Sequence, residues 1–273
     1  MSIEQFSFNQ ATAKYWPLPD VVEGCVAAGV RRAGLWREPV AEYGLERSAA
    51  LVRDAGLTVS TLCRGGFFGA EDWLDDNKRA IDEAATLGAP VLVLVCGGLT
   101  GRPLEEARAR VATGIGALVP YALDAGVRLA VEPMHPMFTA DRSVVATLGG
   151  ALALASPFPP AAVGIALDTY HVWWDERVFP LVAAAGDRIA CVQLADWVLP
   201  LPADVLLGRG LPGTGCVEFA PFLSAVAEAG YTGPIEVEVF NAHLWARPGE
   251  EILRDTIAAY RAVVAGPHAG PRS

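Results

Sequence analysis

Histidine, paired cysteine and positive charge are all scarce in this chain of 273 residues. It contains four histidines, and its five cysteines include no Cys-x-x-Cys pair. So few histidines argue against a histidine-rich site for several metal ions, and the odd, unpaired cysteines indicate reduced thiols in a cytoplasmic protein. The formal net charge of −10 argues against nucleic acid or an anionic membrane as a partner.

Long apolar runs are missing too. The longest, at about residues 89–95, is far too short to span a bilayer. The first residues show no basic segment followed by an apolar one, so we expect no signal peptide. A Gly-rich phosphate fingerprint is absent after the first expected strand, which disfavours an open doubly wound sheet. We expect a small-molecule partner and no membrane association, and the sequence leaves a homo-oligomer open.

Short apolar runs alternate with longer amphipathic stretches along nearly the whole chain. Several of the stretches end in glycine, at positions 29, 56, 88, 126 and 230, and glycine adopts the left-handed cap of a helix at little cost. Eight such units of roughly 30 residues predict an α/β protein with a single (β/α)8 TIM barrel. The expected strands lie near Phe6, Leu35, Thr58 and Val91 and in VRLAVEP, VGIALDTYH, IACVQLAD and GPIEVEVF.

The barrel is predicted to occupy residues 1–266, and residues 267–273 are predicted to form a flexible tail. The expected helices include long ones at 40–56 and 142–156. Residues 197–217 are rich in proline and glycine and form the longest connection, so we expect an active-site loop there.

Four of the expected strands end in an oxygen-bearing side chain, and the C-terminal ends of barrel strands meet at one face. A buried carboxylate without a partner is costly, so such groups are usually paired or bound to metal. Three carboxylates and one amide suit Mg²⁺ or Mn²⁺ better than Zn²⁺. We therefore predict one divalent metal, Mn²⁺ in preference to Mg²⁺ or Co²⁺. Its expected ligands are Glu132, Asp168, Gln193 and Glu238.

Further polar and aromatic residues follow the strand ends. Glu236 shares a strand face with Glu238 one layer deeper, where it needs a partner, either beside the metal ligands or in a buried salt bridge. Arg209 lies between glycines and offers a planar fork for oxygen atoms. Aromatic rings after strands can line a pocket. The tryptophans in such positions are Trp16, Trp36, Trp173, Trp174 and Trp197, and the histidines are His135 and His171.

In this order, the segments VEP, DTYH, VQLAD, RGLPGTG and GPIEVEVF resemble the xylose isomerase-like TIM barrels, a broad group of sugar isomerases and epimerases. The resemblance implies that the four predicted ligands hold the metal and that Glu132 and Glu238 act as acid and base. It also implies that His171 and Arg209 contact substrate oxygens. We add His135, Trp174 and Trp197 as substrate-binding candidates.

We expect a metal-dependent isomerase or epimerase that acts on a sugar or related polyhydroxy carbonyl compound through an enediolate. The alternative is a lyase similar to 3-dehydroshikimate dehydratase, inosose dehydratase or enzymes that cleave C-glycosides. Ketose 3-epimerases usually carry histidine at the position of Gln193, whereas glutamine there resembles hydroxypyruvate isomerases and 3-dehydroshikimate dehydratases. An endonuclease IV-like function is disfavoured by the few histidines, and a noncatalytic sugar-binding barrel is disfavoured by the two glutamates.

Overall fold

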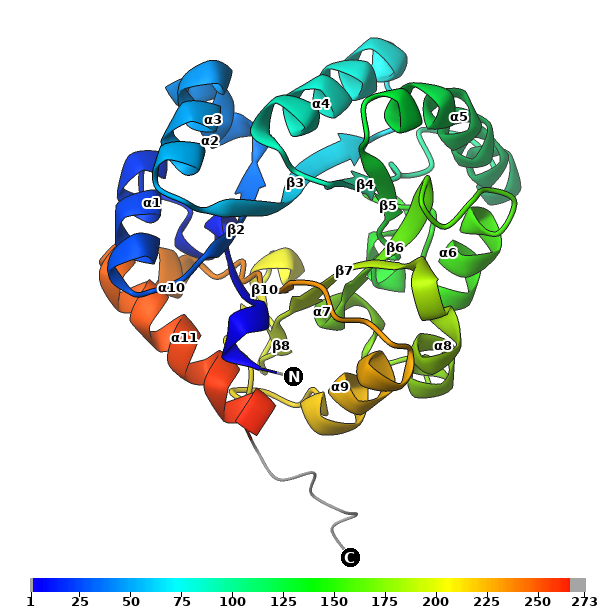
Figure 1. Cartoon of the computed structure of the whole chain (residues 1–273). Helices are drawn as coiled ribbons and strands as arrows, with labels where there is room; N and C mark the ends of the chain where they lie inside the picture. Colours follow the sequence, from blue (N-terminus) through cyan, green and yellow to red (C-terminus); the bar gives the residue numbers. More distant parts are fainter. Residues whose placement is uncertain (1, 266–273) are drawn as a thin grey trace, which may run out of the picture.

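Eight parallel strands close into a barrel in the computed structural model, which describes residues 2–265 (Figure 1). The order around the barrel is β1-β10-β7-β6-β5-β4-β3-β2. This confirms the predicted single (β/α)8 barrel, while the tail predicted at 267–273 lies outside the described residues. The strands are β1 Phe6–Asn9, β2 Arg32–Trp36, β3 Thr58–Gly66, β4 Val91–Val95, β5 Arg128–Val131, β6 Val163–Asp168, β7 Ile189–Leu194 and β10 Ile235–Val237.

Helices form a ring around the barrel (Figure 1). The predicted glycine caps at 29, 56, 88, 126 and 230 all have φ between 68° and 79°, which confirms their role in ending helices. The helices are α1 Leu18–Ala27, α2 Arg37–Tyr43, α3 Leu45–Asp54, α4 Trp73–Leu87, α5 Leu104–Asp124, α6 Leu148–Ala155, α7 Thr169–Val172, α8 Val178–Ala185, α9 Phe219–Glu228, α10 Ala242–Trp245 and α11 Gly249–Ala265.

Two of the helix predictions were wrong in extent. The helix expected at 40–56 is divided into α2 and α3 at Gly44, whose φ of 100° is incompatible with a continuous helix. The helix expected at 142–156 is confined to α6, because Thr147 caps its N-terminus by accepting a hydrogen bond from Gly150 N. Ser143 instead pairs with Gly97 after β4, which extends the wall of the barrel.

The core has two parts. The larger apolar cluster lies mainly between the barrel and the helices, and a smaller cluster alternates with it along the strands, as pleated strands require. The smaller cluster includes Cys63 and Cys191, and Cys96 lies in the larger one, so the three cysteines expected in the core are buried there.

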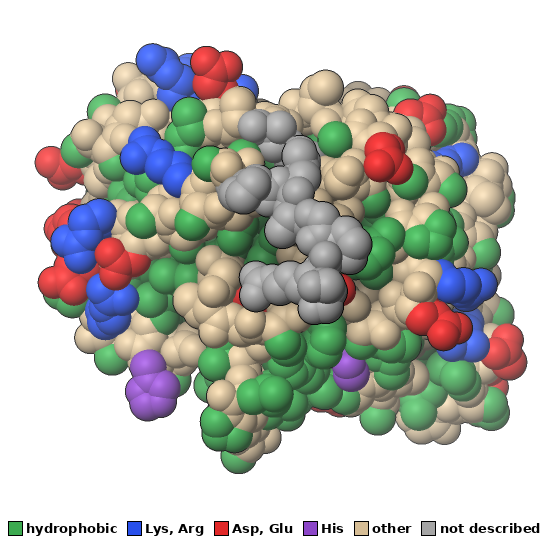
Figure 2. Space-filling view, turned by 90° about the horizontal axis from the view of Figure 1, so that it is seen from below, with side chains coloured by type: hydrophobic (Ala, Val, Ile, Leu, Met, Phe, Trp, Pro, Cys, Tyr) green, Lys and Arg blue, Asp and Glu red, His purple; other side chains and the backbone are tan. Residues whose placement is uncertain are grey.

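Within residues 2–265, no helix combines the length and the apolar character needed to cross a membrane. On the face shown in Figure 2, acidic and basic side chains are interspersed around the periphery. Among the described residues visible there, neither sign of charge forms a continuous field.

Candidate active site

The four predicted metal ligands lie at one end of four consecutive strands. Glu132 directly follows β5, Asp168 ends β6, Gln193 lies in β7 and Glu238 directly follows β10. Each has 5% or less of its surface exposed. Asp168 is in register with Gln193, so the parallel pairing brings these side chains to one level. The fold thus gathers the predicted ligand set, whose binding of metal stays a prediction.

Asp168, His171 and Glu132 come closest together. One ligand atom from each lies within 4.8 Å of the others, which is compact enough for a shared cation. The single turn of α7 brings this about, because it returns the chain beside the strand end and places His171 Nε2 3.8 Å from Asp168 Oδ2. Burial and the nearby Arg209 keep the pKa of His171 well below its usual value, so its imidazole is neutral.

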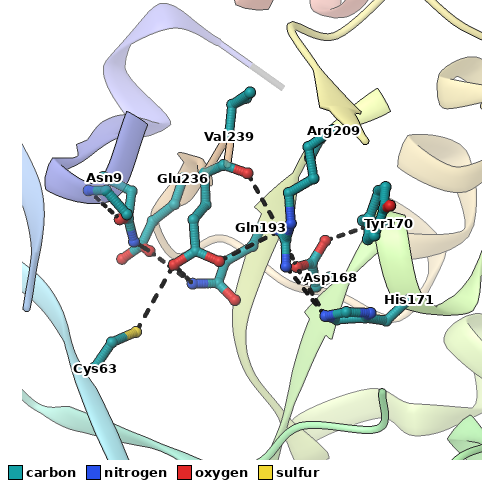
Figure 3. A network of polar contacts seen from close by, with 12 residues as sticks. Asn9, Cys63, Asp168, Tyr170, His171, Gln193, Arg209, Glu236 and Val239 are labelled. Atoms are coloured by element: carbon teal, nitrogen blue, oxygen red, sulfur yellow. Dashed lines mark hydrogen bonds and ion pairs between the residues drawn. The ribbon is translucent and has the colours of Figure 1, made fainter. Parts of the chain in front are cut away.

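Gln193 presents an unused oxygen to the site. Its amide nitrogen lies 3.1 Å from Glu236 Oε2 and 3.4 Å from Glu238 Oε1 (Figure 3). Its Oε1 atom is buried and has no hydrogen-bond partner among the described residues. A buried polar atom without a partner is rare in folded proteins. An amide whose nitrogen is already bound to carboxylates, and whose oxygen is free, is suited to a cation.

Arg209 reaches across the site to Asp168 and His171 (Figure 3). Its Nη1 lies 2.5 Å from Asp168 Oδ2 and 3.4 Å from Glu238 Oε2, and its Nη2 lies 3.0 Å from His171 Nε2. The residue was expected in a loop, but it lies in the short strand β9, Arg209–Gly210, which pairs with β8, Asp196–Trp197. The guanidinium is therefore almost fully buried and held in place by its partners.

The site holds more negative than positive charge. Burial and the adjacent Asp168 raise the pKa of Glu132 to about 8. Burial also raises the pKa of Glu238 well above its usual value and raises that of Asp168, although Arg209 opposes both shifts. Three buried carboxylates share this one guanidinium, so full ionisation requires more positive charge. A divalent cation would supply this charge, and the free oxygen of Gln193 is suited to bind such a cation.

Among residues 2–265, Glu236 has neutral hydrogen-bond partners and forms no salt bridge. Each of its two buried oxygens accepts two hydrogen bonds, below the layer of the predicted metal ligands. Gln193 lies between Glu236 and Arg209 (Figure 3). A Cβ added to Gly34 would lie 2.7 Å from either oxygen, so glycine provides the space for this carboxylate. The donors are Asn9 Nδ2 at 2.9 Å, Gln193 Nε2 at 3.1 Å, Ser60 Oγ at 2.6 Å and Thr61 Oγ1 at 2.8 Å.

A cavity of about 780 Å³ opens over these groups. Glu132, Glu238, His171 and Arg209 all line it, so a ligand in the cavity can reach both glutamates. Aromatic rings form much of the remaining wall, and two arginines join them. These residues are Trp16, Trp36, Phe67 and Phe240, with Arg64 and Arg142.

Trp174, Trp197 and His135 are not among the residues that line this cavity. The His135 ring packs 5.5 Å from that of Trp174 and 5.0 Å from that of Trp197. Trp174 Nε1 donates to the carbonyl of His171 at 2.8 Å. The structure therefore places these three predicted substrate contacts around the His171 segment, away from the cavity, and their proposed role is untested.

Trp16 lines the cavity and also packs against the first and last of the barrel's described helices, α1 and α11. It is a wall residue, and a Cβ added to Gly24 of α1 would lie 2.2 Å from its ring. A Cβ on Gly249 of α11 would lie 2.1 Å from the ring. The indole is thus fitted closely against α1 and α11, which lie side by side (Figure 1).

A model of the xylose isomerase-like TIM barrel family matches residues 22–263. The chain belongs to this family. L-ribulose 3-epimerase of Methylomonas sp. (strain DH-1) is 28% identical over 215 residues, which make up 77% of this chain and 70% of that protein. A 3-dehydroshikimate dehydratase of Pseudomonas aeruginosa is 30% identical over 246 residues, or 85% of this chain. These residues span only 37% of the dehydratase.

Solved structures agree with this family membership. A crystal structure of protein SMc04130 from Sinorhizobium meliloti 1021 has a TM-score of 0.92 and 40% identity, covering 96% of this chain and 99% of that one. The IOLI protein, solved with a zinc atom, has a TM-score of 0.84 and 21% identity, covering 95% and 98% of the two chains. At that identity the second likeness shows the fold alone.

Sequence reasoning missed several residues of the site. Asn9 could have been found, because it ends the first strand just as the predicted ligands end or follow theirs. Arg64 comes near the end of β3 and carried a similar signal. Ser60, Thr61 and Arg142 follow no motif, and only the closed barrel shows where they lie.

Proposed function

We propose that the protein is a divalent-metal-dependent isomerase or epimerase that acts on a sugar or related polyhydroxy carbonyl compound. The observation that carries this proposal is the presence of Glu132 and Glu238 on one cavity, beside an excess of buried carboxylates. The family membership supports an enzyme, and an epimerase and a dehydratase are among its relatives.

Glu132, Asp168, Gln193 and Glu238 would hold the metal, and we expect Mn²⁺, with Mg²⁺ or Co²⁺ as substitutes. The partnerless oxygen of Gln193 and the shared burial of the three carboxylates support this ligand set. The zinc in the IOLI protein supports a divalent ion on this fold. When bound, such an ion supplies positive charge that acidifies the C–H group beside a carbonyl and stabilises the enediolate.

The two glutamates then divide the proton transfers. Glu132 follows β5 and Glu238 follows β10, with β6 and β7 between them, so they approach a ligand from different sides. One carboxylate removes the α-proton, and the other returns a proton to the opposite face or to the neighbouring carbon. Arg209 donates hydrogen bonds to substrate oxygens, and the neutral His171 beside it helps to orient them.

Elimination of water is the second candidate, and Gln193 favours it. The same abstraction of an α-proton can be followed by loss of a hydroxyl group from the β-carbon. The C–O bond then breaks, the electron pair of the former C–H bond forms the C=C bond, and the second glutamate protonates the leaving hydroxide to give water. The 30% identity to a 3-dehydroshikimate dehydratase supports this reading.

Hydrogen exchange distinguishes these reactions. Mn²⁺-loaded protein is incubated in D₂O with a panel of ketoses and of hydroxylated keto acids, and NMR and mass spectrometry follow the products. We expect metal-dependent α-deuteration, with a product of unchanged composition for an isomerase or epimerase. A product lighter by one water would show elimination. Turnover without metal-dependent exchange would refute both reactions.

A further inference from the structure

We propose that the substrate carries a carboxylate or phosphate group, and that Arg64 and Arg142 on the cavity wall bind it. The inference rests on the proposed function, because the anionic group belongs to the carbonyl compound that Glu132 and Glu238 transform. Both arginines line the cavity that contains these glutamates.

The two arginines come from adjacent parts of the wall. Arg64 lies in β3, and Arg142 lies in the segment between β5 and α6. These segments meet over the end of β4. Gly97, just after β4, pairs with Ser143, and a Cβ on Gly97 would lie 3.2 Å from the Cα of Phe67. The two arginines therefore lie on neighbouring segments of one wall, and both line the cavity.

Neither guanidinium is held by a structural partner. Arg64 Nη2 lies 3.7 Å from Glu38 Oε1, and Arg142 Nε lies 3.8 Å from Asp141 Oδ2, both beyond hydrogen-bonding distance. Both acids are mostly exposed, which weakens such pairs further. Among the described residues, we find no hydrogen-bond acceptor for either guanidinium.

Arg37 shows what a structural arginine in this protein looks like. Its guanidinium donates to Asp76 at 3.0 Å and to Glu83 at 2.5 Å, so two carboxylates fix it. Arg64 differs because its guanidinium lies over the ring of Phe67, at 4.6 Å from the centroid, and its donors are unused. The ring orients the planar fork and leaves its edge free for a ligand.

The inner site can be balanced in charge without these two arginines, although Arg64 also acts on Glu132 by lowering its pKa. There, Arg209 and a divalent ion would together balance Glu132, Asp168 and Glu238. Lys14 lines the cavity as well, while Glu38 and Glu42 are the acids on the outer wall. A carboxylate or phosphate would accept charge-assisted hydrogen bonds from the guanidinium groups of Arg64 and Arg142, whereas next to a neutral sugar these groups would be hydrated.

Three ketoses that differ only at C6 test the inference: D-fructose, D-fructuronate and D-fructose 6-phosphate. Calorimetry measures their binding to the Mn²⁺-loaded protein. The anionic group lies far from the carbonyl, so direct contact with the metal does not confuse the comparison. We expect at least one anionic ketose to bind about tenfold or more tightly than D-fructose. Preference for the acid or for the phosphate identifies which anion the site takes.

Variants test whether Arg64 and Arg142 cause the preference for an anionic ketose. The double variant Arg64→Gln/Arg142→Gln should lose the preference, and Arg64→Lys should retain part of it. Arg53→Gln, which changes an exposed side chain of α3, should retain all of it. Circular dichroism and bound Mn²⁺ show that each variant is folded. Equal affinity for all three ketoses, including no binding of any, overturns the inference, and so does a preference that survives in the double variant.

The experiments distinguish failure of the proposed function from failure of the anion site. Anion preference without metal-dependent α-proton exchange would refute the proposed function and leave the anion site standing. Metal-dependent exchange on neutral and anionic ketoses at equal efficiency would refute the anion site alone.

Discussion

Replacement of Glu236 by alanine tests whether one carboxylate organises the polar interior of the barrel. The side chain accepts four hydrogen bonds, two from hydroxyls and two from the amides of Asn9 and Gln193. The hydroxyls can turn to other acceptors. Asn9 cannot turn, because its Oδ1 already accepts from Ala11 N and Trp36 Nε1, both at 3.0 Å. Alanine therefore leaves buried amide donors without acceptors.

The expected destabilisation follows from these donors. Each buried donor without a partner costs about 1–3 kcal/mol, so two of them lower the free energy of unfolding by about 2–6 kcal/mol. That is a large part of a typical total of roughly 5–15 kcal/mol. Glu236→Gln should cost less, because its amide oxygen can still accept from Asn9 and Gln193 while its nitrogen faces hydroxyls that can accept.

The same variants report on the metal site. Without Glu236, the amide of Gln193 retains only its 3.4 Å contact with Glu238 Oε1, so it is held less firmly and its nitrogen can replace the oxygen that faces the metal. We expect Mn²⁺ affinity to fall about 10–100-fold in Glu236→Ala, as is typical when the partner of a metal ligand is lost. Glu236→Gln should retain most of the affinity.

Urea unfolding of the chelated proteins, followed by circular dichroism, measures stability, and calorimetry measures Mn²⁺ binding. Glu23→Ala, on the exposed face of α1, is the control for loss of a glutamate. A Glu236→Ala protein as stable as the wild type would show that burial of the charge costs as much as its hydrogen bonds contribute. A folded Glu236→Ala protein with unchanged Mn²⁺ affinity would refute the orienting role.

Three further predictions concern the inner site. Glu238→Gln should retain its fold and most of its metal but lose about 10²–10⁴-fold in turnover, and near-normal turnover would show that Glu238 is only a ligand. Arg209→Ala should lower kcat/KM by the equivalent of about 1.5–3 kcal/mol without reducing metal content, and unchanged kinetics would show that Arg209 does not bind the substrate. The third prediction concerns pH. The pKa of Glu132 is raised by burial from 4.5 to about 8. The contribution of this group to the stability of the chelated protein should therefore be fully present below about pH 4.5 and lost as pH rises through about 8. Urea midpoints across this range, with and without Mn²⁺, measure the effect, and a flat profile without metal would contradict it.

The barrel and the predicted ligand positions could be derived from the sequence because they depend on local order. A polar residue at the end of an apolar run marks the end of a strand, and closure of the barrel brings such ends together. The same rule could not distinguish the tryptophans. Trp16 and Trp36 line the cavity, whereas Trp174 and Trp197 pack around the His171 segment. The direction in which a loop leaves its strand decides this, and periodicity does not encode it.

The partners of Glu236 show a second limit. Ser60 and Asn9 lie 176 and 227 residues away in sequence, so nothing local links them to this carboxylate. The division of the helix at Gly44 is a smaller case, because glycine inside an amphipathic stretch is compatible with either a break or a continuous helix.

The fit of Trp16 against Gly24 and Gly249 has a consequence for how the chain is synthesised. One side of this indole is supported early, by α1, and the other only after α11 has been made. A nascent barrel without its last helix therefore has an incomplete cavity wall, even when every residue of the candidate metal site has already left the ribosome. Docking of α11 supports Trp16 from its second side, so this part of the cavity wall is fixed only after α11 has been made and has packed against α1.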